Sequence, residues 1–85
     1  MISLFEVGRY IAEARKAKQL TQLELASRAG VSRPTIDLLE NGRATEIGYS
    51  KLARILAVLG QELRVEPIAP ERPTLDDLLK EDSHD

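Results

Sequence analysis

Few residues of this sequence can carry out covalent or metal chemistry. There is no cysteine, and the single histidine, His84, is the penultimate residue. Adjacent carboxylates occur only as Asp76-Asp77 and Glu81-Asp82, in a segment expected to be too flexible to hold the geometry of an acid–base pair. A hydrolase needs a nucleophile with its base, or a metal cage. We therefore expect no enzyme, no metal site and no cofactor.

Charged side chains that can contact phosphates and bases are more plentiful. The net charge of −2 argues against binding to nucleic acid, but the sign changes along the chain. Residues 1–60 hold nine Lys/Arg against six Asp/Glu, whereas residues 61–85 hold three against eight. A basic head and an acidic tail suggest two surfaces with different partners. The alternative is that the acidic tail only keeps a small protein in solution.

The length of 85 residues limits the chain to one small domain with a thin stability margin. Without disulfides or metals, helix packing and self-association must supply the stability. The opening residues 1–6 reach a charge too early for a signal peptide, and no apolar run approaches the roughly 20 residues of a membrane span. We expect a cytoplasmic protein.

Apolar residues at helical spacing predict a first helix over about residues 3–18 and a fourth over 47–59. Gly8 lies inside the first helix, and the sequence offers no reason for it. The inward positions expected for these two helices are Leu4, Val7, Ile11, Ala14, Tyr49, Leu52, Leu56 and Leu59.

Between them, capping signals delimit two short helices. Thr21 and Glu24 form a capping box at the start of the second helix, and Gly30 ends it. Ser32 is the expected N-cap of the third helix, with Pro34 in its first turn. The inward residues are Leu25, Ala26, Ala29, Ile36 and Leu39, and Asn41-Gly42 ends the third helix.

After Gly60 the pattern alternates between polar and apolar residues over 62–66, as in a half-buried strand. A lone strand either pairs with its copy in a second subunit or is extended coil; we favour pairing through Leu63 and Val65. Prolines then recur at intervals of three, which indicates an extended spacer. We expect a DNA-binding domain over 1–60, a dimerisation strand over 61–67 and a flexible acidic tail over 68–85, whose partner-binding residues are Leu75, Leu78 and Leu79.

The tight, glycine-containing link at residues 28–32 is typical of a helix-turn-helix, although an ordinary helical hairpin also has such turns. The surrounding residues resemble the phage-repressor (Cro-like, or XRE) family over about residues 5–60. The matching pattern is Thr21-Gln22-x-x-Leu25-Ala26-x-x-Ala29-Gly30-Val31-Ser32-x-x-Thr35-Ile36-x-x-Leu39-Glu40-Asn41-Gly42-Arg43. The resemblance implies an all-α fold of four to five helices, followed here by one short strand.

The same resemblance assigns roles to individual residues. It implies that Gln22 touches a phosphate and braces the recognition helix, and that Glu40 pairs with Arg15 for a structural purpose. The remaining candidate DNA contacts are the exposed residues of the third helix and its flanks: Ser32, Arg33, Pro34, Thr35, Asp37, Leu38 and Arg43. Arg33 is the best base reader, because its guanidinium can grip guanine O6 and N7 together.

Two positions depart from the family pattern. Asp37 stands where serine is common, and a carboxylate near phosphates is unfavourable unless it accepts from a cytosine amine or an arginine. Leu38 replaces a polar residue and either presses on a thymine methyl group or is simply exposed. These departures affect the expected specificity rather than the docking mode.

The head, strand and acidic tail together resemble the HipB-like antitoxins, which implies operator DNA and a HipA-like kinase toxin as partners. We expect a homodimeric repressor that blocks transcription from an inverted repeat, most plausibly of its own operon. The alternatives are a solitary phage-type repressor and a protein-interaction module that has lost DNA binding.

Overall fold

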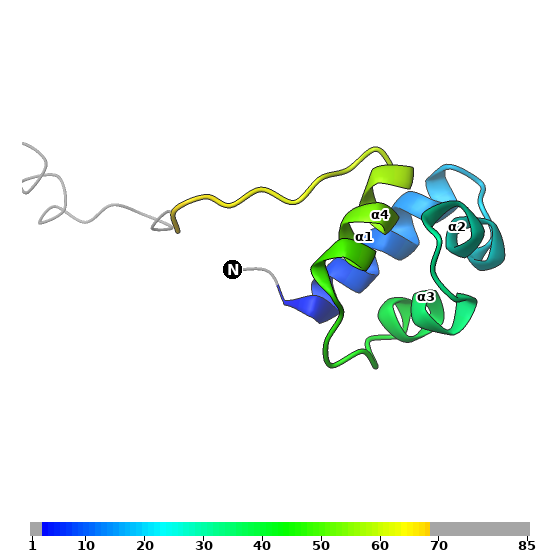
Figure 1. Ribbon diagram of the computed structural model, residues 1–85, viewed down its shortest axis with the longest axis horizontal. Helices are drawn as coiled ribbons and strands as arrows, with labels where there is room; N and C mark the ends of the chain where they lie inside the picture. The colour runs from blue at the N-terminus through cyan, green and yellow to red at the C-terminus, as the bar shows by residue number, and fades with distance from the viewer. Residues whose placement is uncertain (1–2, 69–85) are drawn as a thin grey trace, which may run out of the picture.

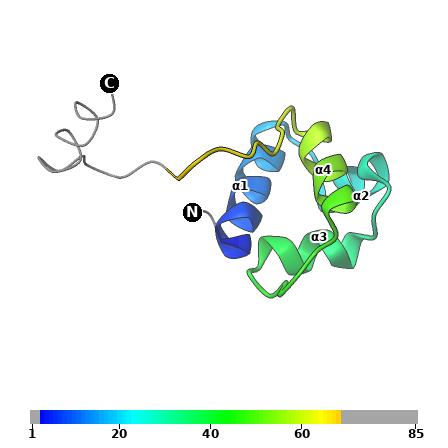
Figure 2. The ribbon, with the colours of Figure 1, turned by 60° about the vertical axis from the view of Figure 1, so that its left-hand side comes forward.

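The computed structural model describes residues 3–68 and shows an all-helical domain. The helices are α1 (Leu4–Ala17), α2 (Gln22–Ala29), α3 (Arg33–Glu40) and α4 (Tyr49–Val58). Helix α3 packs against α1 and α2, and α2 packs against α4, so the four helices follow a ring that is open between α1 and α4 (Figures 1 and 2). This arrangement confirms the all-α, four-helix part of the predicted fold class. None of the described helices is long and apolar enough to cross a membrane.

The ring encloses one hydrophobic core to which every helix contributes. Its buried residues are Val7, Ile11, Leu20, Leu25, Ala26, Ala29, Ile36, Leu39, Leu52, Ile55, Leu56 and Leu59. No polar or charged residue is buried among residues 3–68. The inward faces predicted for the first three helices are confirmed, because no inward residue predicted there is fully exposed.

Side-chain caps fix where the first three helices begin. The Oγ of Ser3 accepts from the N–H of Glu6 (3.2 Å), and Ser32 accepts from Thr35 in the same way (3.3 Å). The capping box of α2 is complete, with 3.0 Å in both directions between Thr21 and Glu24. Hydrogen bonds from the backbone and side chain of Thr21 lower the pKa of Glu24. The stabilisation that the Glu24 carboxylate adds to the box is therefore present at neutral pH and is lost as the pH falls through that lowered pKa.

The fourth helix differs from its prediction. It begins at Tyr49 after Gly48, two residues later than expected, and it ends at Val58, one residue early. Tyr49, predicted to face inward, is 71% exposed, whereas Ile55 is completely buried. The inward stripe is therefore Leu52, Ile55, Leu56 and Leu59, and the first turn of α4 projects beyond the core.

The structure explains Gly8, which the sequence did not. This glycine is buried in α1, and a Cβ atom built on it would overlap the carbonyl oxygen of Leu39 near the end of α3. Glycine therefore lets the backbones of α1 and α3 approach more closely than any side chain would permit. That contact sets the position of α3 in the ring.

Residues 61–68 carry no helix or strand in this single chain. They leave the ring on the side away from α3 (Figures 1 and 2), and the exposed fractions of Val65 and Ile68 are 104% and 82%. The predicted strand over 61–67 stays a prediction, since pairing needs a second copy. The predicted tail residues Leu75, Leu78 and Leu79 lie outside the described residues.

Candidate nucleic-acid interface

The turn between α2 and α3 is built by local hydrogen bonds and by one long-range brace. Gly30 takes the left-handed conformation at φ 70°, and the N–H of Val31 returns to the carbonyl of Ala26 (3.0 Å). From α4, the Nε of Arg54 donates to the carbonyl of Ala29 (2.9 Å). The angle between the two helices is thus fixed by their own turn and by a third helix.

Helix α3 turns a polar, mostly exposed face away from the core. Ser32, Arg33 and Pro34 are exposed at its beginning, and Leu38 is 47% exposed further along. Thr35 is half-buried, and its hydroxyl shares a 2.8 Å hydrogen bond with that of Ser32. Five of the predicted contact residues therefore lie on one accessible stretch of this helix and its cap.

Gln22 bridges from the start of α2 to the acidic residues of α3. Its Nε2 donates to Oε1 of Glu40 (3.1 Å) and to Oδ1 of Asp37 (3.3 Å). This geometry matches the bracing role that the resemblance implies. Both hydrogens of an amide nitrogen are then occupied, and only an acceptor oxygen remains. Because phosphate oxygens also accept, a phosphate contact by this side chain requires it to release one acid.

Asp37 has its partners within the protein. Besides the bond from Gln22, its Oδ1 accepts from Nδ2 of Asn41 at 2.9 Å, and the same nitrogen donates to the Asp37 carbonyl at 3.0 Å. The residue is half-buried rather than fully exposed as predicted. Its carboxylate therefore has a structural function at the end of α3, and this explains how an acid is tolerated on this face.

An ion pair joins α1 to the end of α3. The Nε and Nη2 of Arg15 donate to the two oxygens of Glu40 at 2.7 and 2.9 Å, and Nη1 donates to the Leu20 carbonyl at 2.7 Å. The exposed fractions of the two side chains are 12% and 6%. The hydrogen bonds to Glu40 raise the pKa of Arg15. The predicted structural pair is confirmed, and together with Gln22 it anchors the recognition helix to α1 and α2.

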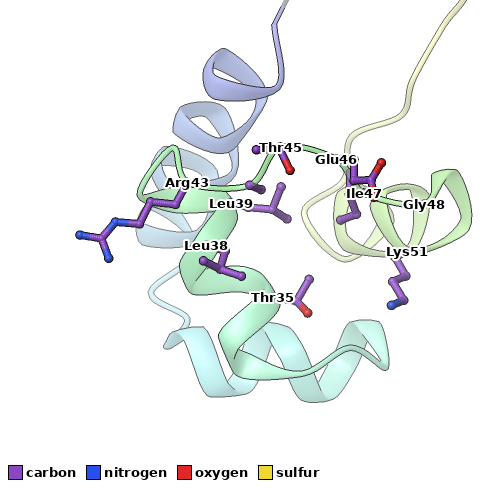
Figure 3. Close-up of a pocket in the computed structure, with 10 residues that line it drawn as sticks. Thr35, Leu38, Leu39, Arg43, Thr45, Glu46, Ile47, Gly48 and Lys51 are labelled. Carbon is purple, nitrogen blue, oxygen red and sulfur yellow. The ribbon is translucent and has the colours of Figure 1, made fainter.

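A cleft of about 590 Å³ separates α3 from the loop and first turn that lead into α4. Thr35, Leu38 and Leu39 line one side, and Ile47 and Lys51 line the other (Figure 3). At the rim, the N–H of Arg43 donates to the Leu38 carbonyl (2.9 Å), and its side chain extends away from the cleft.

Three polar residues that line this cleft were absent from the predicted site: Thr45, the acidic Glu46 and Lys51. Lys51, from the third position of α4, lies across the cleft from Thr35, and Thr45 lines the loop (Figure 3). The predicted fourth helix began two residues too early, so it put Lys51 in the second turn of that helix. In the structure Lys51 lies in the first turn, which faces the cleft. With Arg33 and Arg43 it gives the α3 face a third cation, which suits a polyanion.

The family of the chain follows from these features and from sequence comparison. A family model described as a helix-turn-helix domain matches residues 5–66, which include all four helices and the turn at Gly30. The chain belongs to the helix-turn-helix domain family. This confirms the Cro-like (XRE) resemblance at the level of that family and the expectation that the chain is not an enzyme. No curated protein matches the sequence.

Solved structures show the same fold. A chain of a SinR protein/SinI protein complex is 30% identical with a TM-score of 0.63; the match covers 66% of this chain and 54% of that one. The master regulator for biofilm formation SinR, in complex with DNA, is also 30% identical (TM-score 0.62), with 66% and 89% covered. Apo-HppE is 26% identical (TM-score 0.63), with 72% and 34% covered. This helix-turn-helix chain therefore spans about half the length of the first neighbour.

Proposed function

We propose that this helix-turn-helix chain is a DNA-binding transcriptional repressor that places α3 in the major groove. The observation that carries the proposal is the exposed stretch from Ser32 to Leu38, held rigidly by the Gln22, Arg15 and Arg54 braces. The SinR neighbour was solved in complex with DNA, which supports the same role for this fold. Such a protein works in the cytoplasm, where its operator is.

Each residue of the face has a proposed role. Arg33 reads a guanine edge, and Thr35 contacts a thymine methyl group or a phosphate. Pro34 packs against the sugar–phosphate backbone of the DNA. Ser32, Arg43 and Lys51 contact phosphates, which position the helix without reading sequence. Gln22, Asp37 and Leu38 complete the predicted DNA-binding set; the structure favours bracing for the first two and direct contact for Leu38.

The proposed repressor binds an inverted repeat as a homodimer. A two-fold dimer presents its recognition helices to successive major grooves about 34 Å apart. Dimerisation through a strand over 61–67 is supported by Arg64 and Glu66, whose side chains approach to 3.9 Å and so lie on one side of the chain. An antiparallel pair centred on Val65 sets each of these charges opposite its complement. Occupying the operator blocks transcription by steric exclusion.

We further propose that the repressor is the autoregulating antitoxin of a toxin–antitoxin module, with a HipA-like kinase as toxin. The acidic charge of residues 61–85 favours a second, protein partner over a second DNA contact. The SinR protein/SinI protein complex shows that a neighbour of this fold assembles with another protein. A gene for such a kinase beside this one distinguishes an antitoxin from a solitary repressor.

Titration of the purified protein against its own upstream DNA tests the DNA-binding proposal. Wild type should prefer an inverted repeat over random duplex, with an affinity that falls steeply as salt rises. Arg33→Ala should lose about 1–3 kcal/mol on the specific site and little on random DNA, because it removes a base contact. The matched control is Arg9→Ala, which removes an exposed arginine from α1 and should bind like wild type. Equal losses for both variants, or no site preference, would sink the proposal and favour an interaction module.

A further inference from the structure

An apolar groove lies between α1 and the end of α4, away from the proposed DNA face. Its volume is about 290 Å³, and its lining is Val7, Tyr10, Ala14, Leu56, Leu59, Gln61, Glu62 and Leu63. The ring is open here because α1 and α4 each pack mainly on α2 or α3 rather than on each other (Figure 2). Tyr10 at its rim is 65% exposed and extends the apolar lining of the groove toward solvent.

The segment that leaves this groove carries apolar side chains that its own chain does not cover. Residues 61–63 form one wall of the groove, and the chain then runs away from the ring (Figures 1 and 2). Val65 and Ile68 are 104% and 82% exposed, so their side chains do not pack in the groove of their own chain. We call residues 64–68 the arm.

We propose that the groove of each chain binds the arm of a second copy. Residues 61–63 form one wall of the groove, and the arm follows directly after them. A two-fold axis beside this wall therefore brings the arm of each chain to the groove of the other. In the antiparallel register centred on Val65, the partner's Val65 lies diagonal to Leu63 and on the same face of the pair. Leu63 lines the groove, so this register delivers an apolar side chain to an apolar surface. The inference deepens the proposed homodimer and rests on it.

The charges of the two surfaces favour a second copy over the acidic tail as the occupant. Arg64 and Glu66 flank Val65 within the arm and are complementary to themselves in the antiparallel register. Residues 69–85 hold six acidic and two basic residues, and the groove is lined by Glu62 and by no Lys or Arg. An acidic segment gains no charge complement there, whereas an arm with balanced charges meets no repulsion.

Sedimentation of the full chain without DNA tests this docking. Wild type should dimerise, and Val65→Asp should weaken self-association by at least about tenfold, since a charge replaces a buried apolar side chain. The matched control is Leu23→Asp, which alters an exposed leucine on α2 and should dimerise like wild type. Val65 is fully exposed in one chain, so its substitution leaves the fold intact, which circular dichroism verifies. A monomeric wild type, or a dimer that Val65→Asp leaves unchanged, would overturn the inference.

Cross-linking identifies the contact itself, because the chain has no cysteine of its own. Tyr10→Cys and Val65→Cys chains of different mass, mixed and mildly oxidised, should form a bridge between the two variants beside the bridge between two Val65→Cys chains that the register also predicts. Glu46→Cys, on the loop before α4, should form none with Val65→Cys. Bridging at equal yield in both mixtures would refute the groove as the seat of the arm. A dimer without operator preference would instead contradict the proposed DNA binding and leave the docking intact, so the two failures are distinguishable.

Discussion

Two acidic residues on α3 receive hydrogen bonds from elsewhere in the protein. Glu40 accepts from Arg15 and Gln22, and Asp37 accepts from Gln22 and Asn41. These bonds turn both carboxylates toward the protein, although α3 is the helix proposed to meet a polyanion. At the scale of single residues, the specificity of the face then rests on the cationic and apolar side chains that remain directed outward.

The ion pair between Arg15 and Glu40 gives the first residue-scale prediction. Arg15→Met should lower the free energy of unfolding by about 3 kcal/mol, because it leaves a carboxylate side chain that is 6% exposed with Gln22 as its one remaining side-chain donor among residues 3–68. Arg15→Met combined with Glu40→Leu should recover much of that loss, since neither member of the pair is then left without its partner. Urea denaturation of both variants measures the difference.

The double variant also supplies the control for this prediction. Glu40→Leu alone is measured as well; if the loss of the double variant equals the sum of the losses of Arg15→Met and Glu40→Leu, the residues do not interact and the predicted coupling is wrong. Operator binding by the stable double variant then reports separately whether the anchor of α3 is needed for DNA recognition.

At the scale of elements, the helix-turn-helix depends on backbones that come unusually close. Gly8 brings α1 against the end of α3, and Gly30 turns the chain between α2 and α3. Arg54 then ties α4 to the end of α2. The recognition helix is only eight residues long and would be marginal alone. It is held directly by α1 and α2, and indirectly by α4 through α2.

The close approach of α1 and α3 at Gly8 predicts that alanine destabilises the domain there, although helix propensity alone favours alanine. Gly8→Ala should destabilise the domain by about 2–3 kcal/mol, because the new methyl group overlaps the Leu39 carbonyl and forces α1 and α3 apart. Propensity alone favours alanine inside a helix by about 1 kcal/mol. Thermal or urea unfolding measures the sign, and a stabilised Gly8→Ala variant would contradict the contact.

Gly48→Ala is the matched substitution. A Cβ atom at Gly48 meets nothing within 4 Å, and its φ of −66° suits any residue. The expected change is less than about 1 kcal/mol, from the N-cap preference alone. Comparable losses at the two glycines would mean that loss of glycine, rather than overlap with α3, sets the cost.

At the scale of the whole molecule, the two proposed surfaces do not compete. The α3 face and the arm lie on different sides of the ring, so one dimer can present both recognition helices to DNA (Figure 2). A domain of this size buries a modest share of its surface, and covering the groove and the arm adds apolar burial that one chain lacks. The proposed dimer thereby couples stability to DNA recognition.

This coupling predicts that thermal stability depends on concentration. The unfolding midpoint of wild type should rise as the protein concentration increases, because mass action stabilises a folded dimer. The midpoint of Val65→Asp should be lower and independent of concentration. Calorimetry over a hundredfold range of concentration measures both, and a concentration-independent wild type would show that folding does not require the partner.

The sequence by itself determined the parts of the fold that depend on near neighbours. The caps at Thr21 and Ser32 and the left-handed turn at Gly30 each involve residues within a few positions of each other, so type and spacing suffice to predict them. Resemblance to the family added the Arg15–Glu40 pair. The residues assigned to DNA contact stay predictions until binding is measured.

Tertiary structure decided the features that depend on how distant helices meet. The reason for Gly8, the burial of Ile55 in place of Tyr49, and the occupation of the Gln22 amide by two acids of α3 all arise from contacts between separate helices. The cleft beside Lys51 and the groove beside Leu63 also lie between elements. Local patterns encode where a helix begins and ends, whereas packing selects which of its neighbouring faces is buried and which surface is left for a partner.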